Sequence, residues 1–167
     1  MTIPEFNQTR PGEKQLDLLS DSPEATRSLG RWLGVHLPNR TAVALDGDLG
    51  AGKTCLVAGL AQGLGPLFHF DTYRLRDWED FEEAGLAEYF NEDGIYAIEW
   101  ARQIAAILPE QRLTLQLRRL AAGSFPAPDA VTGSAMENRR LLSLSFSPPL
   151  AALALQLEDA CRQVRLG

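Results

Sequence analysis

Residues 41–54 read Thr-Ala-Val-Ala-Leu-Asp-Gly-Asp-Leu-Gly-Ala-Gly-Lys-Thr. The first six residues form a short, mostly apolar run, which is typical of a central strand that is covered on both faces. Glycines follow at once, and a helical pattern begins near Lys53. This order of strand, turn and helix predicts an α/β fold in which the turn lies at the carboxyl edge of a parallel sheet.

The turn matches the phosphate-binding pattern Gly-x-x-x-x-Gly-Lys-Ser/Thr at all of its positions. A main-chain loop must wrap closely around phosphates so that successive N–H groups point at them, and glycines permit this approach because they carry no side chain. Lys53 brings an ammonium to the β- and γ-phosphates, and the Thr54 hydroxyl can bind Mg²⁺. We therefore expect ATP with Mg²⁺ on this loop, in contact with Gly47, Asp48, Leu49, Gly50, Ala51, Gly52, Lys53 and Thr54.

Two acidic residues follow predicted strands. Asp71 comes after Leu-Phe-His-Phe, and Glu99 comes after Ile-Tyr-Ala-Ile. Ligands of an open parallel sheet lie beyond the carboxyl ends of its strands, so both carboxylates are expected beside the loop. Since Mg²⁺ takes one or two carboxylates together with phosphates and waters, one acid could hold the metal while the other orients water. We predict a metal set of Thr54, Glu99 and Asp71, and a catalytic set of Lys53, Asp71 and Glu99.

The neighbours of these acids allow more than one interpretation. Trp100 could pack on the nucleotide or on a partner, although an aromatic residue at a strand end is more commonly part of the core. Arg74 could neutralise phosphate charge or pair with the acidic run that follows it. His69 is expected to be structural, because no second His or Cys lies at ligand spacing. Each acid, taken singly, could also be a surface charge at the end of a strand.

Composition limits the class of protein. The chain has 167 residues, and a hydrophobic fraction of 45% suits a single folded domain over residues 1–167. A net charge of −6 opposes unaided binding to nucleic acid. Two cysteines are too few for a disulfide framework, and neither a membrane span nor a signal peptide is evident, so we expect a cytoplasmic protein.

Flanking segments complete the predicted architecture. Residues 1–13 are expected to form a loose leader, and residues 121–137 a mobile loop rich in Ala, Gly, Ser and Pro. The loop joins two predicted antiparallel strands, residues 112–120 and 140–146, and the helix after the glycine turn is expected to cover residues 53–64. We predict a central, mostly parallel sheet with antiparallel strands toward the C-terminus and helices on both faces.

Three ordered motifs resemble the TsaE (YjeE) family, the small ATPases of bacterial tRNA threonylcarbamoyladenosine synthesis. These motifs are the glycine loop, the stretch His69-Phe-Asp-Thr-Tyr-Arg-Leu75, and Ile98-Glu99-Trp100. The resemblance implies a P-loop NTPase fold, Mg²⁺ held by Thr54 and Glu99, and a need for Asp71 in hydrolysis. It also implies weak ATPase activity and docking onto homologues of TsaD and TsaB, with tRNA held only through those partners.

One departure from the family lies between the loop helix and the His-x-Asp motif. The family carries there a segment of Ser-Pro-Thr-Phe type that senses the nucleotide, whereas only Pro66-Leu67-Phe68 separate Gly65 from His69. Either the gene has lost this segment, or the sequence leaves out residues that are too mobile to be observed. We favour the second interpretation, because switch loops belong to the least stable parts of a fold.

Other functions fit the sequence less well. A P-loop small-molecule kinase would need an arginine-rich lid, but the arginines of residues 112–119 lie in a predicted strand. A GTPase would need Asn-Lys-x-Asp and Asp-x-x-Gly, and neither occurs. A subunit that binds ATP as a structural or switching ligand without meaningful hydrolysis stays open as an alternative.

Overall fold

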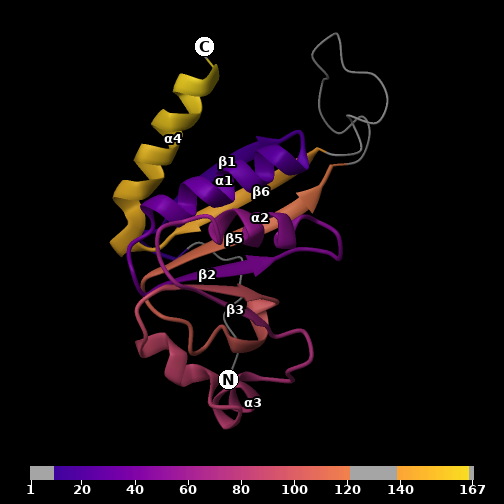
Figure 1. Cartoon of the computed structure of the whole chain (residues 1–167), viewed down its shortest axis with the longest axis vertical. Helices are drawn as coiled ribbons and strands as arrows, with labels where there is room; N and C mark the ends of the chain where they lie inside the picture. The colour runs from indigo at the N-terminus through magenta and orange to yellow at the C-terminus, as the bar shows by residue number, and fades with distance from the viewer. Residues whose placement is uncertain (1–9, 121–138, 166–167) are drawn as a thin grey trace.

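A computed structural model describes residues 10–120 and 139–165 and contains one six-stranded sheet (Figure 1). The strands are β1 (Lys14–Ser20), β2 (Thr41–Asp46), β3 (Leu67–Asp71), β4 (Ile95–Glu99), β5 (Arg112–Arg119) and β6 (Arg140–Phe146). Their order across the sheet is β1-β6-β5-β2-β4-β3. Strands β5, β2, β4 and β3 are parallel, whereas β6 is antiparallel to both of its neighbours. The predicted α/β fold, with antiparallel strands toward the C-terminus, is therefore confirmed.

Helices cover both faces of the sheet. They are α1 (Pro23–His36), α2 (Lys53–Leu60), α3 (Trp78–Glu83) and α4 (Ala151–Arg165), with short 3₁₀ helices η1 (Leu86–Asn91), η2 (Ala101–Ile104) and η4 (Pro148–Leu150). Side chains from α1, α2 and α4 share one apolar core on the face that Figure 1 turns toward the viewer. A second core joins α3, η1 and η2 to the other face of β2 and β4. No helix in the described residues is long and apolar enough to cross a membrane.

Several element boundaries differ from the prediction. Helix α2 ends at Leu60 rather than at residue 64, because the N–H groups of Gln62 and Gly63 bond three residues back and tighten the chain into turns. Helix α3 and the 3₁₀ helix η1 are separated at Gly85, whose φ is 71°. Strand β1 begins directly after the predicted leader, at Lys14. The predicted mobile loop 121–137 and most of the leader lie outside the described residues.

The connection from α2 to β3 is short and continuous. The full sequence has 167 residues, and it runs from Leu60 through Gly65 and Pro66 directly into β3. The interpretation that mobile residues are left out between Gly65 and His69 is therefore wrong. This chain lacks the segment itself.

Helices α1 and α2 meet through glycines. A Cβ atom added to Gly59 would lie 2.2 Å from the carbonyl oxygen of Arg27, and one added to Gly63 would lie 2.3 Å from the carbonyl oxygen of Gly34. A Cβ on Gly30 would likewise lie 2.2 Å from a carbonyl of α2. Such distances leave no room for any side chain, so the two backbones touch. This contact fixes α2, and with it the glycine loop, against the rest of the domain.

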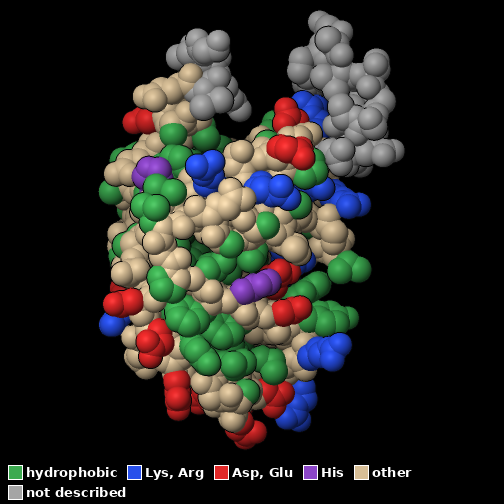
Figure 2. Space-filling view, viewed as in Figure 1, with side chains coloured by type: hydrophobic (Ala, Val, Ile, Leu, Met, Phe, Trp, Pro, Cys, Tyr) green, Lys and Arg blue, Asp and Glu red, His purple; other side chains and the backbone are tan. Residues whose placement is uncertain are grey.

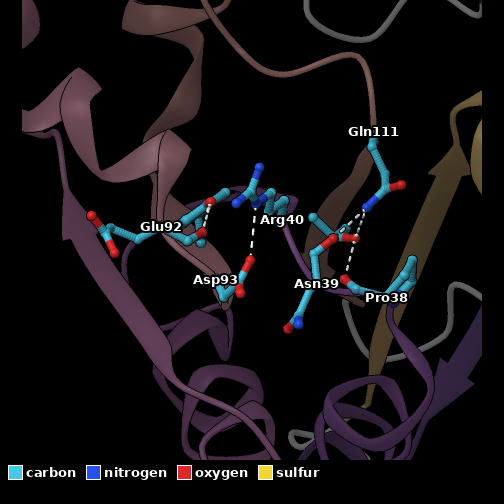
Figure 3. A network of polar contacts seen from close by, with 8 residues as sticks. Pro38, Asn39, Arg40, Glu92, Asp93 and Gln111 are labelled. Atoms are coloured by element: carbon cyan, nitrogen blue, oxygen red, sulfur yellow. Dashed lines mark hydrogen bonds and ion pairs between the residues drawn. The ribbon is translucent and has the colours of Figure 1, made fainter.

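A polar network joins the amino-terminal ends of the parallel strands, at the opposite end of these strands from the glycine loop (Figure 3). The main-chain N–H of Arg40 donates to the Gly94 carbonyl at 2.7 Å, and its guanidinium Nε lies 3.0 Å from Oδ1 of Asp93. The side-chain amide of Gln111 donates to the Asn39 carbonyl at 2.7 Å. These bonds join the starts of β2, β4 and β5, so the carboxyl ends of these strands reach the opposite edge in a fixed register.

The glycine contact gives a stability prediction. In Gly59→Ala the new methyl group meets a backbone carbonyl that cannot move without shifting α1, and we expect a loss of about 1–3 kcal/mol in the free energy of unfolding. Helix propensity alone would favour Ala by about 1 kcal/mol, so a loss isolates the contact. Urea denaturation measures the change.

Gly65→Ala is the matched control for this variant. Its Cβ would have only the Asn39 side-chain oxygen nearby, at 3.9 Å, so the free energy of unfolding should change by no more than about 0.5 kcal/mol. Equal stability of Gly59→Ala and wild type would contradict the described contact between α1 and α2.

Candidate functional site

The glycine loop joins buried strand β2 to helix α2 and takes a backbone path that side chains would obstruct. Gly47, Gly50 and Gly52 have φ values of 142°, 75° and 112°, which L-residues with a side chain rarely adopt. A Cβ on Gly47 would also lie 2.4 Å from the carbonyl oxygen of Leu117 in β5. The loop therefore keeps its main chain accessible while resting closely on the sheet.

Lys53 lies inside this loop. Its side-chain Nζ donates to the carbonyl of Gly47 at 2.5 Å and to that of Asp48 at 3.1 Å, and only 6% of the residue is exposed. The same atom lies 4.5 Å from the ring centroid of Trp100, and Tyr73 packs against that ring at 5.1 Å between centroids. The structure thus brings Trp100 beside the lysine of the loop.

The two predicted acids arrive at the same edge of the sheet. Asp71 and Glu99 are partners in the register of β3 and β4, and Glu99 is in turn the partner of Leu45 in β2. Their side chains lie on the same face of the sheet as the side chain of Ala97, which packs in the core that contains α2. Glu99 is nearly buried and one strand from the loop, whereas Asp71 is exposed and two strands away. Glu99 is therefore the acid closer to the loop.

His69 contacts one of these acids. Its Nε2 lies 3.1 Å from Oε1 of Glu99, and this hydrogen bond raises the pKa of His69 above 6.5, with a smaller contribution from the charge of Asp71. The sequence interpretation of His69 as merely structural missed this contact. The spacing of two residues places His69 and Asp71 on one face of a strand, but the contact with Glu99 also requires the pairing of β3 with β4.

Other polar contacts hold the strand ends that carry the site. Arg102 pairs with Asp46, the last residue of β2, through Nε at 3.0 Å and Nη2 at 2.5 Å. The buried hydroxyl of Thr72 lies 2.8 Å from the Glu99 carbonyl and 2.9 Å from the Trp100 carbonyl. The sequence did not indicate these partners, because they join segments that are far apart in the chain. They fix where β2 ends and where β4 turns.

Of the other predicted residues, Ala51 is buried in the core that contains α2, whereas the following three are exposed. Thr54 is exposed in the first turn of α2, and Leu49 at the tip of the loop is 92% exposed. Arg74 is also exposed. In the part of the chain that the structure describes, no three His, Cys, Asp or Glu side chains are grouped closely enough to bind a metal ion.

Comparison with known proteins gives the family. A sequence model described as "Threonylcarbamoyl adenosine biosynthesis protein TsaE" matches residues 20–66 and 65–123. Together these stretches cover more than half of the chain and contain the glycine loop and both acids. The chain belongs to the TsaE family. The resemblance that the three motifs indicate is thereby confirmed.

Individual TsaE proteins agree over most of their length. The TsaE of Bacillus subtilis is 34% identical over 127 residues, which cover 64% of this chain and 79% of that protein. The TsaE of Treponema pallidum is 37% identical over 126 residues, with 64% and 93% covered. A crystal structure of B. subtilis YdiB matches with a TM-score of 0.66 at 26% identity, and the match covers 90% of this chain and 97% of that one.

The same comparisons locate the missing TsaE segment. A share of 64% of 167 residues is about 107 residues, so an alignment of 127 residues has roughly 20 positions without a counterpart in this chain. The two stretches matched by the family model meet at residues 65–66. The gap therefore falls on the turn between α2 and β3, next to His69 and Asp71.

Proposed function

We propose that this chain is a Mg²⁺-dependent ATP-binding protein with weak ATPase activity that acts in threonylcarbamoyladenosine modification of tRNA. Its membership of the TsaE family supports the pathway. The nucleotide part of the proposal depends on one observation, the loop from Gly47 to Thr54. Three glycines with positive φ leave its main chain open, and a lysine lies within it.

Each residue of the site has a distinct task in this proposal. Lys53 exchanges its two carbonyl contacts for phosphate oxygens, which are stronger acceptors because they carry full charge. Thr54 and Glu99 would hold Mg²⁺, which supplies charge neutralisation at the phosphates. Asp71, one strand further from the loop, would orient the attacking water. Trp100 and the main-chain amides of the loop complete the proposed contacts to the nucleotide, except the N–H of Ala51, which donates to the Asp48 carbonyl at 3.0 Å.

A non-hydrolysing ATP-binding subunit is the second candidate, and the missing segment favours it. Roughly 20 residues that other TsaE proteins carry beside the acidic pair are absent here. If that segment orders the catalytic groups, this chain binds ATP without hydrolysing it. A kinase is disfavoured because the proposed lid arginines belong to strand β5, where Arg112 pairs with Glu13 at 3.3 Å.

Partners follow from the family and from charge. We propose that homologues of TsaD and TsaB bind this chain in the cytoplasm and that they, rather than this chain, hold the tRNA. The net charge of −6 and the acidic side chains concentrated over the lower half of the face in Figure 2 disfavour direct contact with RNA phosphates.

Removing the lysine tests the nucleotide site. Lys53→Ala should weaken ATP and ADP binding by roughly 10-fold to 100-fold, because it removes a charge-assisted hydrogen bond to phosphate. Isothermal titration calorimetry measures both affinities. Lys14→Ala, the same change at an exposed position of β1, should bind like the wild type; unchanged affinity in Lys53→Ala would count against the site.

Replacing Glu99 and Asp71 separately tests which of them binds Mg²⁺ and which is needed for hydrolysis. Glu99→Gln keeps the size of the side chain but lowers its affinity for Mg²⁺, so Mg²⁺ should strengthen ATP binding less than in the wild type. Affinity measured with EDTA should not change. Asp71→Asn should retain the Mg²⁺ effect and lose phosphate release. The reverse pattern would assign the metal to Asp71.

Phosphate release separates the two candidate functions. We expect slow turnover by the isolated chain and faster turnover after addition of TsaD and TsaB homologues, since the partners would supply order that the short turn after α2 does not. Release should stop in Glu99→Gln, which serves as the control for contaminating ATPases. Tight ATP binding with no release under either condition would support the non-hydrolysing subunit instead.

A further inference from the structure

Two arginine side chains donate hydrogen bonds to main-chain carbonyls of the glycine loop. The outer side of the loop is the side on which these arginines lie. Nε of Arg119 donates to the Gly50 carbonyl at 3.0 Å, and Nε of Arg140 donates to the Ala51 carbonyl at 2.9 Å. Both side chains come from strands β5 and β6 rather than from the loop or from α2. Arg140 is buried, with 6% of the residue exposed, whereas Arg119 is exposed.

These arginines are direct partners across the β5–β6 pair. The register aligns Arg119 with Arg140, and both lie on the face whose leucines pack in the core that contains α2. Like charges directly opposite each other in an antiparallel pair are destabilising, so this arrangement disfavours folding unless groups of opposite polarity lie nearby. The two carbonyls of the loop are such groups, and a bound polyphosphate would be a stronger one.

The contacts also determine where the loop amides point. In a trans peptide the C=O and N–H groups point in opposite directions, and the structure has no cis peptide bonds among its described residues. Because Arg140 holds the Ala51 carbonyl toward the sheet, the N–H of Gly52 must point away from it. A Cβ on Gly52 would lie 3.1 Å from the Arg140 Nε, so the guanidinium packs directly against this peptide.

We propose that Arg119 and Arg140 are positioning residues of the nucleotide site, an inference that rests on the proposed function. They hold the Gly50 and Ala51 carbonyls on the outer side of the loop, so that its inner side presents amides to the β-phosphate of a nucleotide. They also bring two positive charges next to the loop in a chain of negative net charge. Neither arginine needs to touch the nucleotide.

Calorimetry with ADP and ATP tests this proposal in the full chain. Arg140→Met should weaken the affinity for both nucleotides by roughly 10-fold, the expected effect of losing a buried hydrogen bond with one charged partner. Arg119→Met should weaken both affinities by roughly 2-fold to 5-fold, because Arg119 is exposed. Equal losses for ADP and ATP are expected because both carry the β-phosphate. Arg140→Lys keeps the charge and should recover part of the affinity.

Arg118→Met is the matched control. Arg118 neighbours Arg119 in β5 but lies on the opposite face of the sheet, where its Nη2 donates to the side chain of Gln116 at 2.5 Å. It should bind both nucleotides like the wild type. If Arg118→Met weakens binding as much as Arg119→Met, general charge explains the effect and the proposal is overturned.

Other outcomes are equally decisive. Unchanged affinities in Arg119→Met and Arg140→Met, with normal wild-type binding, would overturn this inference alone. A loss for ATP but not for ADP would also overturn it, since it would mean contact with the terminal phosphate. No binding by the wild type would overturn the proposed function together with the inference. If Arg140→Met does not fold, as judged by circular dichroism, Arg119→Met and Arg140→Lys still decide the matter.

Discussion

A main-chain loop leaves its amides open to a phosphate only where no side chain is in the way, and this constraint accounts for the backbone path of the glycine loop. The loop after β2 meets it with three glycines of positive φ. A fully buried strand precedes the loop and a helix follows it, so both of its ends are fixed. The two arginines, the acid pair and the aromatic ring beside the lysine are all arranged around this one turn.

The parts of this arrangement that could be predicted from sequence are those set by local pattern. Residues 41–54 contain strand, loop and helix start within one short stretch, and the physical role of each glycine is visible in the motif. Asp71 and Glu99 could be placed because each ends a strand, and the carboxyl ends of parallel strands share one edge. The strands of the sheet, including the antiparallel pair, follow from apolar patterning.

The parts that could not be predicted depend on pairing between distant segments. Arg140 bonds to a residue 89 positions away in the chain, and His69 to one 30 positions away. Which arginine of β5 faces the loop is decided by register, and a shift of one residue would replace Arg119 by Arg118. The early end of α2 likewise reflects turns near its contact with α1. The sequence shows the short connection before β3, and the relatives give the size of the gap there, roughly 20 positions.

The backbone contact between α1 and α2 has a consequence for evolution as well as for stability. Where two helices meet through side chains, a larger residue on one can be balanced by a smaller one on the other. Gly59 and Gly63 instead face main-chain carbonyl groups, which are the same in every residue and so cannot be made smaller by mutation. These positions can therefore drift only if the whole helix pair moves apart, which would displace the residues that follow Gly52. Under the proposed function, selection for nucleotide binding would therefore also act on glycines outside the loop.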